Sequence, residues 1–235
     1  MSTVAATVTD QLREAPPGLH GNGNYFGLAW NALAWLEGHV HEGMSTLETG
    51  CGGSSIVFAA AGARHTVVAP IAGEHDEVRD WCAARGISTE RLTFLALPSH
   101  EAWAGAWTPE PLDLVLIDGA HGFPYPALDW FHTAPHLRTG GHVVVDDAFL
   151  PSVHSLVRFL RASEGWEQIA APAYRTVVFR KLTDEISYDW VGSRHDRRPH
   201  FDYLPPPQRL AAHVRFLLID SNPAGQRLLS RLRRG

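Results

Sequence analysis

Two short, very apolar runs that end in acidic residues constrain the fold of this chain more than any other feature. The first is DLVLID at residues 113–118, and the second is HVVVDD at residues 142–147. Runs of this length and composition, bounded by glycine and charged residues, predict strands that are buried on both faces. Such strands occur in parallel sheets with helices on both sides, so an α/β fold is expected.

Helix and strand alternate along most of the chain. The segment STLETGCGGSSIVFAAAGARHTVVAP, residues 45–70, predicts a strand, a glycine-rich turn, an Ala-rich helix and a second strand. Helices are also expected at 26–40, 74–87 and 151–162, and strands at 91–97, 112–118, 139–148 and 176–182. The alternation predicts one central α/β domain.

The character of the sequence changes towards both ends. Residues 1–44 contain a turn-rich stretch and one helical pattern, and are predicted to form an N-terminal helical cap. Residues 45–182 are the predicted core. Residues 183–235 are rich in charge, aromatic side chains and proline, and are predicted to be a C-terminal extension that covers a substrate or contacts a second copy of the chain.

Composition narrows the classes of function. The chain has 235 residues, of which 45% are hydrophobic and 19% charged, as in globular proteins. A formal net charge of -5 argues against a nucleic-acid partner. The two cysteines, Cys51 and Cys82, form no CxxC pair, so no disulfide framework or thiolate zinc site is expected and a reducing cytoplasm fits. An uninterrupted apolar segment of about 18 residues does not occur, so no membrane partner is expected.

The glycine-rich turn lies where parallel α/β sheets bind ligands, at the carboxyl end of a strand. Gly50, Gly52 and Gly53 follow Glu48 and allow a ligand to approach the backbone closely. The turn ETGCGGSS has no lysine of a phosphate-binding GxxxxGK[ST] loop. It also has Ser55 at the position where a full GxGxxG pattern would have Gly or Ala.

The remaining pattern, E-x-G-x-G, resembles motif I of class I S-adenosylmethionine-dependent methyltransferases. This resemblance implies a Rossmann-like, doubly wound fold with a mostly parallel seven-stranded sheet and helices on both faces. It also implies S-adenosyl-L-methionine as cofactor. The cofactor-binding residues expected from the resemblance are Glu48, Gly50, Cys51, Gly52, Ser54, Ser55, Ser99 and Asp118.

The stretches DLVLIDGAH and GGHVVVDDA are similar to the fourth and fifth strands of metal-dependent O-methyltransferases, the group of catechol and macrocin-sugar enzymes. The likeness covers residues 45–182 and implies a magnesium site made by Asp118, Asp146 and Asp147, with His121 as general base beside Asp118. A hard cation stabilises a deprotonated hydroxyl, and an imidazole can take its proton at neutral pH. The expected acceptor is a small hydroxylated molecule, such as a natural-product sugar or phenol.

Two features depart from these patterns. Many class I methyltransferases end their second strand with an acidic residue that holds the cofactor ribose, but Ala69 and Pro70 stand there in this chain, and Glu74 is the nearby carboxylate that could reach back. Adjacent residues of a strand face opposite ways, so Asp146 and Asp147 can share one ion only if the chain bends.

Three alternatives therefore stay open at this point. The first is a metal-independent methyltransferase that uses His121 as base and in which the aspartates are structural. The second is a catalytically silent protein that binds S-adenosylmethionine. The third is a nicotinamide-dependent oxidoreductase, which the incomplete GxGxxG disfavours.

Overall fold

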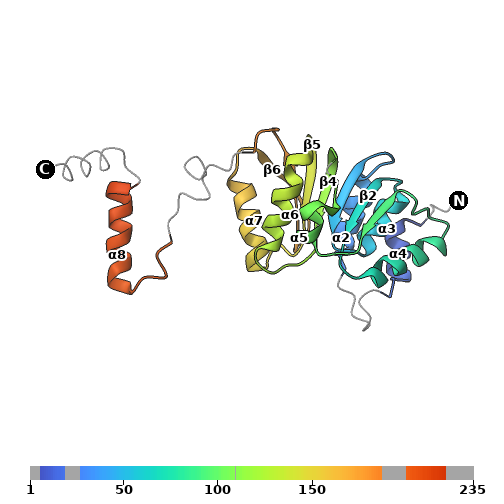
Figure 1. Ribbon diagram of the computed structural model, residues 1–235, viewed down its shortest axis with the longest axis horizontal. Helices are drawn as coiled ribbons and strands as arrows, with labels where there is room; N and C mark the ends of the chain where they lie inside the picture. The colour runs from blue at the N-terminus through green and yellow to red at the C-terminus, as the bar shows by residue number, and fades with distance from the viewer. Residues whose placement is uncertain (1–5, 19–26, 109, 187–199, 221–235) are drawn as a thin grey trace. The chain divides into compact units, whose positions relative to one another are not determined.

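The computed structural model describes residues 6–18, 27–108, 110–186 and 200–220. The chain divides into two compact units, Met1–Ser187 and Tyr188–Gly235. The first unit contains a central sheet with helices on both sides (Figure 1). The candidate site described below belongs entirely to this first unit.

The elements of the first unit follow the alternation that the sequence predicts. Its strands are β1 (Ser45–Thr49), β2 (Arg64–Val68), β3 (Leu92–Leu95), β4 (Leu112–Ile117), β5 (Leu137–Val145), β6 (Trp166–Ala173) and β7 (Thr176–Lys181). Its helices are α1 (Val8–Glu14), α2 (Trp30–His39), α3 (Gly53–Ala60), α4 (Ala72–Ala83), α5 (Ser99–Glu101), α6 (Tyr125–Thr133) and α7 (Pro151–Ala162), with short helical turns η1 (Ala102–Ala106) and η2 (Ala134–His136).

The seven strands form one sheet in the order β3-β2-β1-β4-β5-β7-β6. Neighbouring strands from β3 to β5 run parallel, whereas β7 is antiparallel to both β5 and β6. The strand order reverses between β1 and β4, which is where doubly wound sheets open a crevice at their carboxyl ends. The predicted Rossmann-like fold with a mostly parallel seven-stranded sheet is confirmed.

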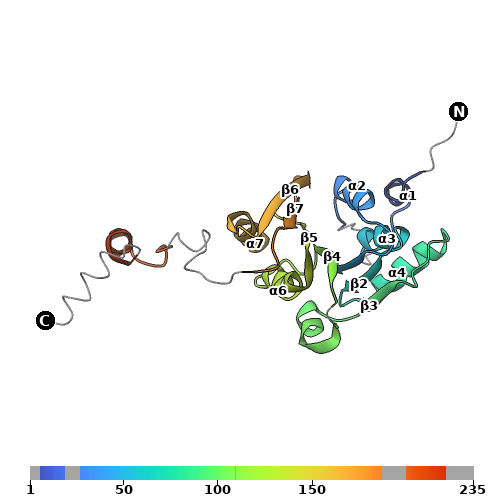
Figure 2. The same ribbon diagram turned by 90° about the horizontal axis from the view of Figure 1, so that it is seen from above.

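Two hydrophobic cores lie on opposite faces of the sheet. One joins helices α1 to α4 to Leu114 and Leu116 of β4, and the other joins α6 and α7 to Val115 and Ile117 of the same strand. Figure 2 shows the two sets of helices on either side of the sheet. Successive side chains of a strand point to opposite faces, so a strand buried on both faces must be apolar throughout.

Strand β6 is not among the strands that the sequence predicts, and helices α1 and α6 are not among the predicted helices. The sequence of β6, WEQIAAPA, has few β-branched residues, and most of its side chains are exposed or half-buried at the edge of the sheet. Edge strands need no continuous apolar run, because only one side of the backbone and part of one face are covered. Strand β5 also begins earlier than predicted, at Leu137, because its first residues pair with the start of β4.

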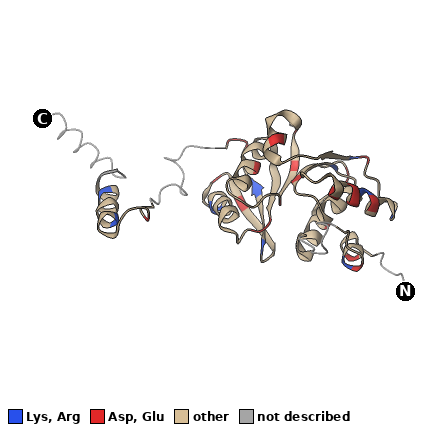
Figure 3. Cartoon of the chain, turned by 60° about the horizontal axis from the view of Figure 1, so that its bottom comes forward, with Lys and Arg blue, Asp and Glu red and all other residues tan. Residues whose placement is uncertain are grey.

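The described part of the second unit consists of α8 (Pro206–Arg215) and the helical turn η3 (Phe216–Asp220). The described part of the predicted C-terminal extension thus contains a helix. None of the helices in the described residues is long and apolar enough to cross a membrane. Figure 3 shows acidic and basic residues interspersed over the described elements.

The turn after β1 depends on a glycine at position 50. Gly50 has φ +99°, and a Cβ atom placed there would lie 2.6 Å from the carbonyl oxygen of Asp118. We expect Gly50→Ala to lower the free energy of unfolding by about 2 kcal/mol or more, because strain and the steric conflict add. Denaturant unfolding would measure the change.

Gly73→Ala is the matched control for this prediction. Gly73 lies in α4, and nothing lies within 4 Å of the Cβ that the substitution would add. A helical Gly→Ala substitution should stabilise by roughly 0.5–1 kcal/mol. Equal stability effects at positions 50 and 73 would contradict the steric explanation.

Candidate active site

A cavity of about 530 Å³ opens at the carboxyl ends of the central strands. Its walls come from the turn after β1, the end of β2 and the turn after β4, at residues 49–54, 68–71 and 118–121. Ser99, Tyr125, Asp147 and Arg175 complete the lining near the cluster described below. The size and the mixture of backbone, apolar and charged groups are typical of a small-molecule site.

Beneath the glycine-rich turn, Glu48 is almost fully buried and accepts three side-chain hydrogen bonds. Ser54 Oγ donates to Glu48 at 2.6 Å, Ser55 Oγ donates to its other oxygen, and His65 Nε2 donates at 3.1 Å. A buried carboxylate requires such partners, because its desolvation is otherwise costly. Glu48 and Ser55 therefore fix the shape of the turn, and neither lines the cavity.

The other predicted cofactor residues do line the cavity. They are Gly50, Cys51, Gly52, Ser54, Ser99 and Asp118. Contact between these six residues and a cofactor stays a prediction. Glu48 and Ser55 lie outside the cavity lining, so their positions do not favour direct contact with a cofactor. The signal in the sequence identified the turn correctly, but an E-x-G-x-G pattern does not say which side of the turn the acid faces.

Asp129 of α6 is a buried acid near the cavity that the sequence analysis did not select. Its Oδ1 accepts a hydrogen bond from Trp103 Nε1 at 3.1 Å. Burial raises the pKa of Asp129, and hydrogen bonds from Ser99, Trp103 and Thr49 oppose that shift. Two of these partners, Ser99 and Thr49, line the cavity, so Asp129 supports its wall from behind.

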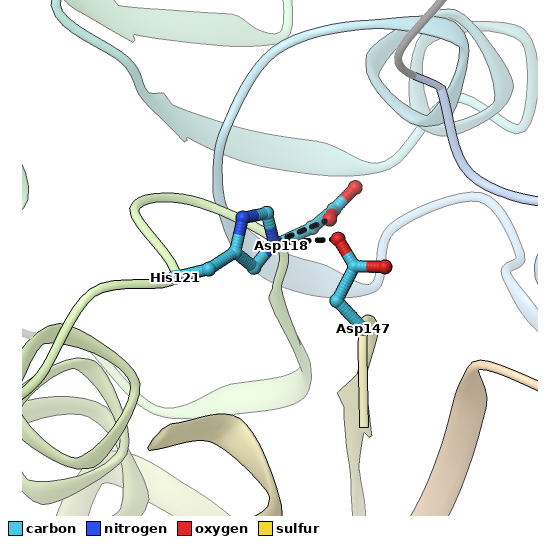
Figure 4. A group of neighbouring side chains, drawn as sticks. All are labelled: Asp118, His121 and Asp147. Carbon is cyan, nitrogen blue, oxygen red and sulfur yellow. Dashed lines mark ion pairs between the residues drawn. The ribbon is translucent and has the colours of Figure 1, made fainter. Parts of the chain in front are cut away.

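One nitrogen of the His121 imidazole faces the carboxylates of both Asp118 and Asp147, as Figure 4 shows. His121 Nε2 is 3.0 Å from Asp147 Oδ2 and 3.6 Å from Asp118 Oδ1. Asp118 follows β4, His121 lies in the loop after it, and Asp147 follows β5. Each of the three offers one ligand atom, and these atoms lie within 4.8 Å of one another.

The chain bends after β5. Such a bend is required if residues that follow β4 and β5 are to share one site. Asp147 has φ +51°, the single positive value among non-glycine residues in the described part of the chain. Aspartate tolerates this left-handed conformation better than most side chains. The bend directs Asp147 into the cavity, whereas Asp146 remains on the strand.

Asp146 lies outside the group formed by Asp118, His121 and Asp147, and its role as a ligand of the same ion stays a prediction. Its side chain is fully buried, accepts a hydrogen bond from Thr176 Oγ1 at 2.5 Å and pairs with Arg175 Nη2 at 2.8 Å. It is also absent from the cavity lining, unlike Asp118 and Asp147. Both carboxylates lie 2.8 Å from Arg175 Nη2, but only Asp147 also lines the cavity, and His121 is the third member of the group there.

Arg175 is the second functional candidate that the sequence analysis missed. Its Nη2 lies 2.8 Å from Asp146 Oδ2 and 2.8 Å from Asp147 Oδ1, so one guanidinium bridges both acids. Burial alone would lower the pKa of Arg175, but the charges of Asp146 and Asp147 outweigh it and raise the pKa. Arg175 stands in the turn between β6 and β7, far along the chain from any motif, so no local pattern marks it.

The surroundings of the cluster raise the pKa of both Asp118 and His121. Burial raises the pKa of Asp118 to about 7, with the carboxylates of Asp146 and Asp147 adding to the shift and His121 opposing it. The neighbouring Asp118 carboxylate is the largest cause that raises the pKa of His121, and burial of the ring opposes it. Groups with shifted pKa values that line a cavity are candidates for proton exchange with a substrate.

A sequence profile described as "Methyltransferase domain" matches residues 47–148, which include β1 to β5 and all four of Gly50, Asp118, His121 and Asp147. The chain contains a methyltransferase domain. The predicted class, class I S-adenosylmethionine-dependent methyltransferase, and the predicted enzyme activity are confirmed. A search among curated protein sequences finds no match.

Solved structures agree with this methyltransferase fold. An O-methyltransferase from Bacillus cereus in complex with SAH has a TM-score of 0.60 at 13% identity, over 77% of this chain and 93% of that one. TomG, the O-methyltransferase from Streptomyces achromogenes involved in tomaymycin synthesis, in complex with SAM, has a TM-score of 0.56 at 17% identity, over 75% and 87% of the two chains. The O-methyltransferase NovP has a TM-score of 0.57 at 17% identity, over 68% and 84%. At such identities the likeness concerns the fold.

The pairing of His121 with Asp118 predicts a measurable titration in the methyltransferase freed of divalent cations by a chelator. Because Asp118 is the largest cause of the upward shift, the pKa of His121 should lie above 6.5. Asp118→Asn removes the negative charge but leaves the ring buried, so it should lower the pKa of His121. The pH dependence of the histidine Cε1–H signals in NMR spectra would measure both values.

Asp76→Asn is the control, because Asp76 is an exposed partner of Arg79 on α4. That substitution should leave the titration of His121 unchanged. A His121 pKa that stays the same in Asp118→Asn would show that the carboxylate does not control the ring.

Proposed function

We propose that this protein is an S-adenosylmethionine-dependent O-methyltransferase that transfers a methyl group to a hydroxyl of a small molecule. The observation that carries the proposal is the position of the His121 imidazole between Asp118 and Asp147 within the cavity. A hydroxyl becomes a good nucleophile for the methyl group only when a base removes its proton. An imidazole held between two carboxylates at the end of the sheet has the chemistry of that base.

The surroundings of His121 support its role as general base. The side chain is 34% exposed, so its ring can meet a substrate in the cavity. Asp118 and Asp147 stabilise the imidazolium that forms when the ring accepts the proton, since opposite charges at this distance attract strongly in a partly buried site. We therefore propose that Asp118, which lines the cavity, acts in catalysis through His121.

A divalent cation fits the same end of the cavity. Asp118 and Asp147 supply carboxylate oxygens within 4.8 Å of each other and of His121 Nε2, and oxygen donors suit Mg²⁺. We propose that Asp118 and Asp147 hold the ion and that Asp146, which pairs with Arg175, supports Asp147 from behind. When bound, such an ion lowers the pKa of a coordinated hydroxyl and stabilises its anion.

A metal-independent methyltransferase on the same fold is the second candidate, and Arg175 is the observation that favours it. Its guanidinium already neutralises part of the charge of Asp146 and Asp147, which a metal would otherwise do. In this version His121 is the base, Asp118 and Asp147 orient it, and no ion is required. Turnover that is indifferent to a chelator would select this candidate.

The proposal also covers the molecule that accepts the methyl group and the type of biosynthesis in which the protein acts. A cavity of about 530 Å³ at the ends of the strands suits a small hydroxylated acceptor more than a polymer. TomG, one of the similar structures, is involved in tomaymycin synthesis, and we propose natural-product biosynthesis as the setting here also. We further propose that the protein acts in the cytoplasm and that homo-oligomers form. Residues 187–199 and 221–235 of the predicted C-terminal extension lie outside the described residues.

Loss of the base should have a large effect on turnover. We expect His121→Ala to lower kcat for a hydroxylated acceptor by about 10²-fold to 10⁴-fold, while the affinity for S-adenosylhomocysteine changes little, because the ring acts on the acceptor proton. Methyl transfer from radiolabelled cofactor to a panel of phenols and deoxysugar glycosides would measure turnover.

His41→Ala is the control, because His41 is exposed and does not line the cavity. It should leave kcat unchanged. Wild-type turnover in His121→Ala would remove His121 from the proposed chemistry.

The two adjacent aspartates should separate metal binding from stability. Asp147→Asn should weaken Mn²⁺ binding, measured by electron paramagnetic resonance, because it removes a proposed ligand charge. Asp146→Asn should instead lower the free energy of unfolding by about 1–3 kcal/mol, because the buried carboxylate that Arg175 and Thr176 share is lost. Mn²⁺ bound equally well by the wild type and Asp147→Asn would exclude the proposed ion site.

A further inference from the structure

The end of the cavity near β2 has no carboxylate at the end of the strand. Ala69 and Pro70 follow β2 directly, and both line the cavity together with Ile71. None of these three side chains can accept a hydrogen bond. A ribose bound at this end would bury two hydroxyl groups, and buried hydroxyls without partners are costly.

Glu74 brings a carboxylate to this part of the cavity from a different element. It stands in the first turn of α4, is 7% exposed and lines the cavity. The cavity lining contains three acidic residues, Glu74, Asp118 and Asp147, and the latter two belong to the His121 cluster. Glu74 is therefore the remaining acid among the described lining residues.

Glu74 also lies near the glycine-rich turn, which lines the same cavity. Burial, and after it the carboxylate of Glu48, raises the pKa of the Cys51 thiol, and the charge of Glu74 adds to the shift. An electrostatic influence of Glu74 on Cys51 requires that the first turn of α4 lies close to the turn after β1. These are the two segments between which a nucleoside would lie in a doubly wound sheet.

We propose that Glu74 binds the ribose hydroxyls of the cofactor in place of a carboxylate at the end of β2. The inference rests on the proposed use of S-adenosylmethionine and assigns one of its contacts. An ionised carboxylate offers only acceptors, so it matches a pair of hydroxyl donors, and hydrogen bonds to charged groups are stronger than neutral ones.

Calorimetric binding of S-adenosylhomocysteine to the full chain tests this contact without requiring turnover. Glu74→Gln keeps the shape of the side chain but loses its charge, and Glu74→Ala removes both acceptors. Each should weaken binding by about 10-fold to 100-fold, the range expected for hydrogen bonds to a charged group. Circular dichroism would check that each variant keeps the wild-type fold.

Glu77→Gln is the matched control. Glu77 lies on the same helix, is exposed and does not line the cavity. The affinity of this variant for S-adenosylhomocysteine should equal that of the wild type.

A 2′,3′-dideoxyribose analogue of S-adenosylhomocysteine tests whether the contact is with the ribose. The wild type should bind the analogue more weakly than S-adenosylhomocysteine, and Glu74→Gln should cause no further loss for the analogue, because the partner of Glu74 is already absent. If Glu74→Gln weakens the binding of both ligands by the same factor, Glu74 does not contact the hydroxyls and the inference is wrong.

The outcomes separate the inference from the function on which it rests. If the wild type does not bind S-adenosylhomocysteine, the proposed function fails. If the wild type binds S-adenosylhomocysteine and both Glu74 variants bind it as tightly as the wild type does, the function stands and the assignment of Glu74 is wrong.

Discussion

The parallel register of β1, β4 and β5 is the constraint on which the site depends. Thr49 pairs with Ile117, and Ile117 pairs with Val145, so the three strands end at one level. The residues that follow them must therefore meet at one edge of the sheet. The meeting is close enough that a side chain at Gly50 would collide with the backbone of Asp118. Glycine at this position thus permits both the strand pairing and the cavity.

The charges gathered at this edge explain much of the local structure. Asp118, Asp146 and Asp147 bring three carboxylates close together, and two of these side chains are mostly buried while Asp146 is fully so. Carboxylates in such surroundings need cationic or hydrogen-bonding partners. Arg175 reaches Asp146 and Asp147, and His121 reaches Asp118 and Asp147, so each of the three acids has a nitrogen-bearing partner. A ligand bound here therefore meets a site whose acids are already oriented.

The buried pair of Glu48 and His65 illustrates a different use of charge. His65 stacks on Phe58 of α3 and also contacts Thr46 through Nδ1 at 2.8 Å, so the pair links β1, β2 and α3. Both carboxylate oxygens of Glu48, the acid of the glycine-rich motif, accept hydrogen bonds within the protein. The motif therefore shapes the cavity through the backbone of the turn, while carboxylates from other elements face the interior of the cavity.

The sequence by itself determined the fold class, the glycine-rich turn and the edge of the sheet that bears the site. Strands such as LDLVLI must be apolar when both faces are buried, and their polar ends then mark the carboxyl edge. This reasoning found Asp118, His121 and Asp147, but missed β6, whose exposed edge position leaves no apolar run.

Only the tertiary structure decided which acids share a site. Asp147, whose backbone is left-handed, lines the cavity, whereas Asp146 is fully buried outside it, and Arg175 arrives from a distant turn to bridge the two acids. Glu74 likewise reaches the cavity because α4 packs beside the end of β2. Side-chain direction at a strand end depends on one backbone torsion and on partners far away in the sequence, and a linear pattern encodes neither.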